Sequence, residues 1–175
     1  FNVTGFPTAL INRQERWTSP QPSNVSQVTS KIGRKVYASL AMESTVSGDV
    51  LDLKVKVMMG YSYKSMKLAV YMLEDGLVYD QRNFTSYYGG ADPIRDFVHY
   101  DVLRRSLTDV FGDDIPQDQV GHNKTFTRDF QYAIPPSYDK NKVKLVAFVT
   151  TGSERDIINV RQSKLGESQD FQPLN

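Results

Sequence analysis

Few side chains in this sequence could carry acid–base or nucleophilic chemistry. The chain has 175 residues, no cysteine and two histidines, His99 and His122. Asp96 and Asp101 lie near His99 in the sequence, and a carboxylate beside an imidazole is one arrangement of a general base. No Gly-x-Ser-x-Gly turn, which would present a serine nucleophile, accompanies it. A histidine hydrogen-bonded within a packed segment explains the pattern more simply, so we predict no catalytic residue and no enzymatic activity.

Three carboxylates within residues 112–118 are the candidates for a metal site. Asp113, Asp114 and Asp118 supply oxygen ligands of the kind that calcium prefers. The ligand spacing of a known calcium loop is missing, and a chain without cysteine has no thiolate for zinc. A solvated acidic turn fits this segment better. We therefore predict no bound metal and no cofactor, and keep these three residues as weak candidates.

The segment most suggestive of binding is residues 83–90, Asn-Phe-Thr-Ser-Tyr-Tyr-Gly-Gly. Its rings, Phe84, Tyr87 and Tyr88, stand between small polar residues, a composition typical of adaptable binding loops. Tyr61 and Tyr63 are expected to join them at one rim. The alternative is that the rings fold back onto the core, and an exposed aromatic patch would favour binding. We predict that a ligand or partner binds here.

Composition excludes several function classes. The formal net charge is +1, from 21 basic and 20 acidic residues, which argues against a nucleic-acid or polybasic membrane binder. No run of about 18 apolar residues predicts a transmembrane helix. Arg104-Arg105 has too few basic neighbours for a phosphate site. We expect one of these two guanidinium groups to be half-buried and paired with a carboxylate, in a structural role.

Alternation of apolar and polar residues predicts strands along most of the chain. In residues 51–59, every second residue is apolar, from Leu51 through Val55 to Met59. Such a period of two places one face in a core and one in water. Residues 35–59 therefore predict a β-hairpin with a turn at residues 47–49. Further strands are predicted at 68–73, 77–81, 125–132, 144–151 and 157–162. We expect Val55 and Val146 to face a common core.

Two segments between these strands are harder to assign. The Glu74-Asp75-Gly76 turn is predicted to join residues 68–73 and 77–81 as a hairpin, because Asp-Gly readily supplies positive φ. Residues 93–111 place apolar side chains at roughly helical spacing, although alternation also fits residues 97–103. We favour helical turns around a short extended piece.

Seven short strands separated by turn signals predict a mainly β protein. We expect an antiparallel β-sandwich, immunoglobulin-like or jelly-roll-like, with a short helical segment, over residues 35–175. Residues 17–31 are rich in Pro, Ser and Gln and predict a linker, in which Ser23 or Asn24 caps a short helix.

The first residues resemble part of another fold. Gly5-Phe6-Pro7-Thr8 precedes an apolar strand at Ala9–Ile11, and this resembles the end of a thioredoxin-like domain, where a proline, usually cis, precedes a central strand. We interpret residues 1–34 as a remnant of an upstream thioredoxin-like domain plus a linker. Open strand edges recruit partners, so we expect residues 1–13 to pair with the sandwich or with a second copy, giving a homo-oligomer in the latter case.

Several motifs in order carry a resemblance to a family. They are residues 5–8 with Asn12-Arg13, the run Phe97-Val98-His99-Tyr100-Asp101-Val102-Leu103-Arg104, residues 146–149, and residues 158–162 with Gly166-Glu167. This order resembles the outer membrane protein 28-related family of Bacteroides-type bacteria. The resemblance implies a thioredoxin-like N-terminal part, a β-sandwich C-terminal part, and a lipid-anchored surface receptor or adhesin of the cell envelope. It brings no catalytic residues.

The resulting prediction is a non-enzymatic binding or adhesion domain at the bacterial outer membrane or cell surface. Its partner would be a protein or a glycan, and it would meet the membrane only through an N-terminal lipid anchor upstream of these residues. One alternative is a carbohydrate-binding module. The other is the accessory domain of a thiol-redox protein whose active site lies upstream.

Overall fold

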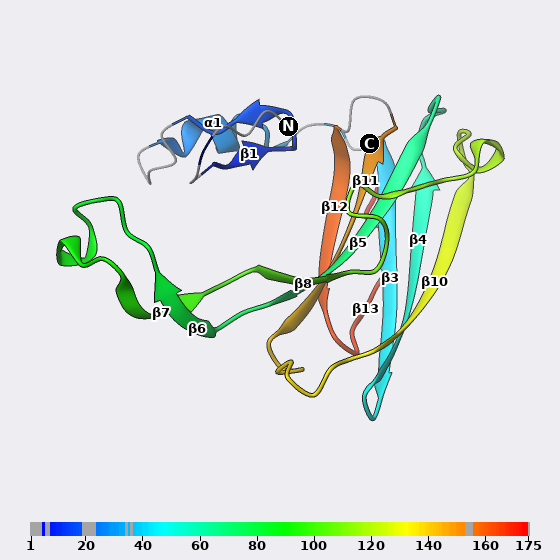
Figure 1. Cartoon of the computed structure of the whole chain (residues 1–175). Helices are drawn as coiled ribbons and strands as arrows, with labels where there is room; N and C mark the ends of the chain where they lie inside the picture. Colours follow the sequence, from blue (N-terminus) through cyan, green and yellow to red (C-terminus); the bar gives the residue numbers. More distant parts are fainter. Residues whose placement is uncertain are drawn as a thin grey trace.

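The computed structural model describes residue 5 and residues 8–18, 24–33, 35, 37–152 and 156–174. Two antiparallel sheets pack face to face, which confirms the predicted sandwich (Figure 1). The first sheet has the order β10 (Thr125–Ala133), β4 (Val50–Met59), β3 (Ala38–Ser47) and β13 (Ser168–Gln169). The second has the order β12 (Ile157–Lys164), β11 (Val143–Thr151), β5 (Met66–Glu74) and β8 (Val102–Ser106), with the short β9 (Asp113–Asp114) beside β5.

The core lies between the two sheets, where the alternating residues meet. The predicted hairpin at residues 35–59 is confirmed as β3 and β4, which pair from Ala38↔Met59 to Ser47↔Val50. Val55 is fully buried, as predicted. Its neighbours in the core include Leu40, Leu53, Leu68, Val70, Met72, Leu145, Ala147 and Val149. The prediction for Val146 was wrong, because Leu145, Ala147 and Val149 take the inner positions of β11 and leave Val146 on the outer face.

The predicted hairpin at Glu74-Asp75-Gly76 was also wrong. β5 pairs with β11 and β8, whereas β6 (Leu77–Gln81) pairs with β7 (Ile94–His99) in a separate two-stranded sheet. Gly76 has a φ of +72°, so the turn exists, but it directs the chain out of the sandwich. Figure 1 shows β6 and β7 standing away from the two packed sheets. We call residues 77–99 the arm.

Residues 93–111 are extended, so the preference for helical turns there was wrong. They contain β7 (Ile94–His99) and β8 (Val102–Ser106), with a bend at Asp101 between the two strands, so the alternation over residues 97–103 spans two strands. Neither β7 nor β8 contains a fully buried residue, so no buried face imposes a clear period on the sequence of this segment. Val98 is 40% exposed and Leu103 is 47% exposed.

The N-terminal residues form a small unit beside one end of the sandwich (Figure 1). β1 (Leu10–Ile11) pairs with β2 (Glu15–Arg16), and α1 (Ser26–Thr29) is the predicted short helix. Val25, rather than Asn24, is its N-cap, and Asn24 instead donates a hydrogen bond to the carbonyl of Thr18. Phe6, Pro7 and Ser23 lie outside the described residues. The thioredoxin-like origin of residues 1–34 stays a prediction.

One side chain ties this unit to the outer face of the second sheet. The guanidinium of Arg13 lies 4.5 Å from the centre of the Phe148 ring, and its Nη2 donates to the Val110 carbonyl at 3.1 Å. The attraction between a cation and an aromatic ring is stronger where the cation is shielded from water. Among the described residues, none of the helices has the length and apolar character of a membrane span.

Candidate functional site

The arm carries the largest group of exposed rings among the described residues. At its tip, between β6 and β7, Phe84 is 78% exposed, Tyr88 is 66% exposed and Tyr87 is 56% exposed. The rings therefore do not fold back onto the sandwich core, which was the alternative to a binding loop. Val78 and Val98 form an exposed cross-strand pair nearer the sandwich.

Asn83 organises the tip loop. Its Nδ2 donates to the carbonyl oxygens of Tyr87 at 2.8 Å and Ala91 at 3.0 Å, and its Oδ1 accepts from the backbone and hydroxyl of Thr85. The backbone N–H of Asn83 donates to Asp92 at 3.0 Å. Asparagine commonly folds a loop in this way, by standing in for backbone hydrogen bonds. The loop thus presents its rings on a frame held by its own polar groups.

Behind the tip, one face of the arm carries a row of rings that contact one another edge to face or at a tilt. Tyr88 and Phe97 meet edge to face with centroids 5.9 Å apart, and Phe97 meets His99 at 5.0 Å. The ring of Tyr79 lies 6.5 Å from that of His99. Edge-to-face packing of this kind stabilises aromatic pairs beyond simple burial. It joins the tip loop to the strands below it.

His99 does not form the general-base arrangement weighed from the sequence. Its Nε2 lies 3.3 Å from the Tyr79 carbonyl oxygen, and its ring contacts the rings of Phe97 and Tyr79. Asp101 instead binds Lys144. The second histidine, His122, places Nδ1 2.9 Å from the Gly60 carbonyl in a turn of the sandwich.

A buried ion pair fixes the base of the arm. Arg104 of β8 donates to Glu74 at the end of β5 over 2.5 Å, and its guanidinium lies 4.1 Å from the centre of the Tyr138 ring. The other oxygen of Glu74 accepts the backbone N–H of Asp139 at 2.8 Å. Arg104 therefore has the paired, structural role predicted for one guanidinium of Arg104-Arg105.

A second ionic contact lies next to the first. The ammonium of Lys144 sits between Asp75 at 2.7 Å and Asp101 at 2.5 Å, the residues at which the arm leaves and rejoins the sandwich. Hydrogen bonds to Asp101 and then to Asp75 raise the pKa of Lys144. The hydrogen bond from Lys144, followed by that from the Asp101 backbone, lowers the pKa of Asp75. Both shifts favour the charged forms, so the contact holds the two ends of the arm together.

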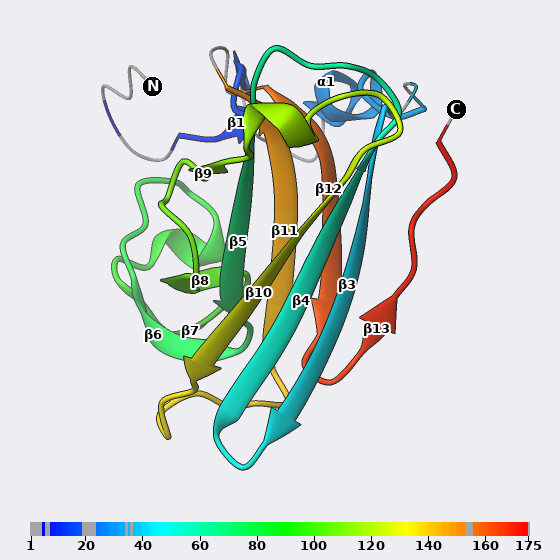
Figure 2. The ribbon, with the colours of Figure 1, turned by 90° about the vertical axis from the view of Figure 1, so that its right-hand side faces the viewer.

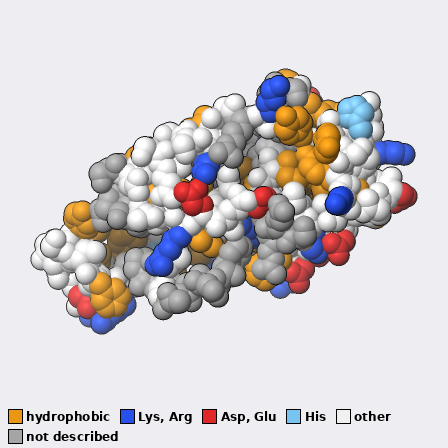
Figure 3. All heavy atoms as spheres, turned by 90° about the horizontal axis from the view of Figure 1, so that it is seen from above, with side chains coloured by type: hydrophobic (Ala, Val, Ile, Leu, Met, Phe, Trp, Pro, Cys, Tyr) orange, Lys and Arg blue, Asp and Glu red, His pale blue; other side chains and the backbone are white. Residues whose placement is uncertain are grey.

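Tyr61 and Tyr63 do not share a rim with the arm, so that prediction was wrong. They lie in the β4–β5 connection, where Tyr61 packs edge to face with Tyr37 at 6.3 Å and with Tyr63 at 5.7 Å. In Figure 2 this connection lies at the top of the sandwich, well away from β6 and β7. Figure 3 shows hydrophobic side chains in separate groups toward opposite ends of the molecule. Burial raises the pKa of Tyr63 to about 12, with smaller effects of the neighbouring phenols Tyr37 and Tyr61.

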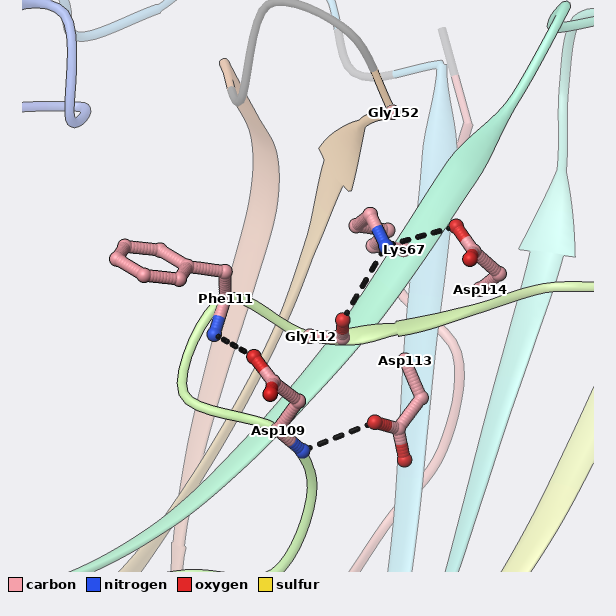
Figure 4. Close-up of a pocket in the computed structure, with 7 residues that line it drawn as sticks. All are labelled: Lys67, Asp109, Phe111, Gly112, Asp113, Asp114 and Gly152. Atoms are coloured by element: carbon pink, nitrogen blue, oxygen red, sulfur yellow. Dashed lines mark hydrogen bonds and ion pairs between the residues drawn. The ribbon is translucent and has the colours of Figure 1, made fainter.

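The acidic segment lines a depression of about 530 Å³ beside β5 and β9 (Figure 4). Asp114 is paired with Lys67 at 2.8 Å, and Asp113 is paired with Arg128 at 2.6 Å. Asp113 also accepts the backbone N–H of Asp109 at 2.9 Å. Asp118 lies apart, in the short 3₁₀ turn Gln117–Gln119. Among the described residues, no three carboxylate or imidazole groups are arranged to hold a metal ion.

Few sequence signals indicated the residues that hold the candidate site in place. The role of Asn83 in the turn could have been predicted from its Asn-x-Thr pattern, because an asparagine side chain commonly accepts hydrogen bonds from the residue two positions later. Glu74 and Arg104 are 30 residues apart, and Lys144 and Asp101 are 43 apart, so no local pattern joins them.

Together these features define a β-sandwich domain with a projecting aromatic arm. A family model described as outer membrane protein Omp28 matches residues 1–169. The chain therefore belongs to the Omp28 family, as the sequence resemblance predicted, and is a protein of the bacterial cell envelope. Comparison with curated proteins found no match.

Two solved structures are similar to this one. HBP35 of Porphyromonas gingivalis aligns with a TM-score of 0.69 and 19% identity, over 94% of this chain and 54% of that one. A domain of the outer membrane lipoprotein Omp28 from Porphyromonas gingivalis aligns with a TM-score of 0.50 and 16% identity, over 75% of this chain and 89% of that one. At these identities the similarity shows the fold. The chain spans about half the length of the HBP35 structure.

Proposed function

We propose that this chain is a non-enzymatic binding domain of the bacterial envelope, and that the tip of the arm contacts a protein partner. The observation that carries the proposal is the exposure of Phe84, Tyr87 and Tyr88 on one loop that projects from the sandwich. Exposed apolar patches on a folded protein commonly mark interaction sites. Tyrosine and phenylalanine are also among the residues that dominate interface cores.

The frame beneath the rings supports this proposal energetically. Binding loses affinity when it must first order a loop, and a loop that is already ordered avoids that loss. Asn83 and Asp92 hold the tip by hydrogen bonds, and Glu74–Arg104 and Lys144 hold the base. The rings are therefore presented by a supported element.

The polar groups of the tip favour a protein over a glycan. Sugar hydroxyls require unoccupied polar side chains in addition to an aromatic face. Here the amide of Asn83 is satisfied within the loop, and Arg82 pairs with Asp92 at 3.2 Å. The surface offered to a partner is thus mainly aromatic. The rings alone favour the second candidate, carbohydrate binding, since they could stack on a sugar face.

Site-specific photo-crosslinking tests the proposal. A benzophenone amino acid at Tyr88 would be irradiated with an outer-membrane fraction of the source bacterium, and the same group at Val50, exposed on the sandwich, would serve as the matched control. We expect a discrete protein adduct from position 88 only, competed by the unlabelled chain. Substitution of Phe84, Tyr87 and Tyr88 by Ala in the competitor should abolish this competition while lowering the melting temperature only slightly, through loss of the Tyr88–Phe97 contact.

Three results would count against the proposal. Equal adducts from positions 88 and 50 would show non-specific contact. Full competition by the triple-Ala chain would remove the rings from the interface. Ring-dependent signals on a glycan array without a protein adduct would favour the carbohydrate alternative.

A further inference from the structure

The arm has an open strand edge. Among the described residues, β6 is paired with β7 on one side and with no strand on its other side. A two-stranded sheet is only marginally stable by itself in water. An unpaired edge presents a row of backbone donors and acceptors that can pair with a further strand.

Other edges of the molecule carry features that discourage such pairing. The edge strand β10 directs Arg128 inward, where it pairs with Asp113 across the sandwich. β7 follows Pro93 and contains Asp96 at a φ of +51°, which interrupts a regular edge. Inward charges, prolines and local irregularities are the usual means of blocking edges. β6 has the sequence Leu-Val-Tyr-Asp-Gln and contains no proline. Its one charged residue, Asp80, is paired with Arg95, and its register with β7 is regular from Leu77 to Tyr79 and shifts only after Tyr79.

We infer that β6 pairs antiparallel with β6 of a second copy of this chain, about a two-fold axis at Val78. In this register Val78 lies opposite the partner's Val78, and Leu77 lies opposite the partner's Tyr79. Because Val78 already pairs with Val98, four valines would cross one face of the resulting sheet in a row. Apolar cross-strand pairs of this kind stabilise sheets.

Charge also favours this register. Asp80, which is bound to Arg95 across the arm, would lie opposite the partner's Gly76 and would face no like charge. A shift of the axis to Tyr79 would instead place Asp80 opposite the partner's Val78, which sets a charge against an apolar side chain. A two-fold contact uses the same surface on both copies, so one strand supplies both halves of the interface.

Pairing would give a four-stranded sheet with the order β7, β6, β6, β7 and two tip loops on one particle. This inference does not depend on the proposed function, because it uses the strand edge rather than the rings of the tip. If both hold, the dimer would bind a surface through two loops and gain avidity.

The absence of cysteine from the sequence makes a sharp test practicable. In the full chain, Val78→Cys and, as the matched control, Val98→Cys would each introduce one thiol on the same face of the arm. On the axis, facing Cα atoms would be about 4.5–5.5 Å apart. The two control positions would be separated by three strand spacings, roughly 14 Å, beyond the ~7 Å limit for a disulfide.

We expect mild oxidation to cross-link Val78→Cys at least tenfold more than Val98→Cys. Light scattering over about 1–100 µM, a range suited to small interfaces, should show dimer for the unmodified chain and monomer for Val78→Lys. The triple-Ala tip variant should remain dimeric, which separates this inference from the proposed function. A monomeric unmodified chain, or equal cross-linking at both positions, would overturn it. A Val78→Lys dimer that dissociates when residues 1–13 are deleted would place the interface at the N-terminal segment instead.

Discussion

The ion pair at the base of the arm gives the most demanding test of these arguments. The side chain of Glu74 is 3% exposed and that of Arg104 is 21% exposed, at an N–O distance of 2.5 Å. In Arg104→Ala the carboxylate of Glu74 would keep its hydrogen bond from the Asp139 backbone but lose the cation with which it is paired. An uncompensated buried charge is costly, whereas removal of an exposed charge is not.

The expected loss is about 3–5 kcal/mol in the free energy of unfolding, the usual effect of removing one partner of a buried pair. The loss of contact with the Tyr138 ring adds to it. For a domain of this size, such a loss lowers the melting temperature by roughly 6–20 °C. The matched control is Lys54→Ala, since Lys54 is 43% exposed and lies 3.7 Å from Asp129. Its cost should be below about 1 kcal/mol.

Urea unfolding of a variant that lacks both charges would check the assignment. Glu74→Leu combined with Arg104→Leu removes both charges, and replacing a buried pair by apolar side chains is often neutral. We expect the double variant to be more stable than Arg104→Ala. If Arg104→Ala lost no more than Lys54→Ala, Glu74 would have to be solvated in solution, and the account of a rigid arm base would be refuted.

Three further predictions concern the core, a buried phenol and the N-terminal unit. Val55→Asp should lower the free energy of unfolding by several kcal/mol, because Val55 is fully buried and an unpaired charge there is expensive, whereas urea unfolding of Lys54→Ala should show little change. The pKa of Tyr63 is raised to about 12 in the folded chain, above the value of about 10 in the unfolded chain. The contribution of the neutral Tyr63 phenol to stability should therefore be complete below pH 10 and lost between about pH 10 and 12. In Tyr63→Phe this part of the pH dependence of the melting temperature should disappear. Arg13→Ala should speed proteolysis within residues 8–33 without lowering the melting temperature of the sandwich, since Arg13 joins the two through Phe148 and Val110; unchanged proteolysis would show that other contacts suffice.

The central strands of the sandwich could be predicted because they bury one face in the core. In β4, the alternation from Leu51 to Met59 follows directly from a core on one side and water on the other. The same rule failed for Val146, where the outer face of β11 is also apolar and the sequence alternation is lost. A run that is apolar at every position cannot indicate which residues point inward.

The arm could not be predicted because local signals do not specify a strand's partner. Asp75-Gly76 correctly indicated a turn, yet the position of β6 depends on contacts between residues distant in sequence. Glu74 meets Arg104, and Lys144 meets both Asp75 and Asp101. These contacts form only when the folded sandwich brings β5, β8 and β11 together, so no local sequence pattern indicates them. The composition of the tip loop was informative for the opposite reason, since Asn83 forms its hydrogen bonds within a few residues.

The arm is suited to contact another surface because it is held firmly at its base and leaves apolar side chains exposed. A strand that served only the sandwich would gain most by burying its apolar residues in the core. Here the fold places Glu74–Arg104 and Lys144 at the base of a ribbon that leaves Val78 and Phe84 in water. A supported base combined with an unburied surface does little for the stability of the isolated chain. It becomes favourable when a partner covers that surface, because the ribbon then needs little further ordering to bind.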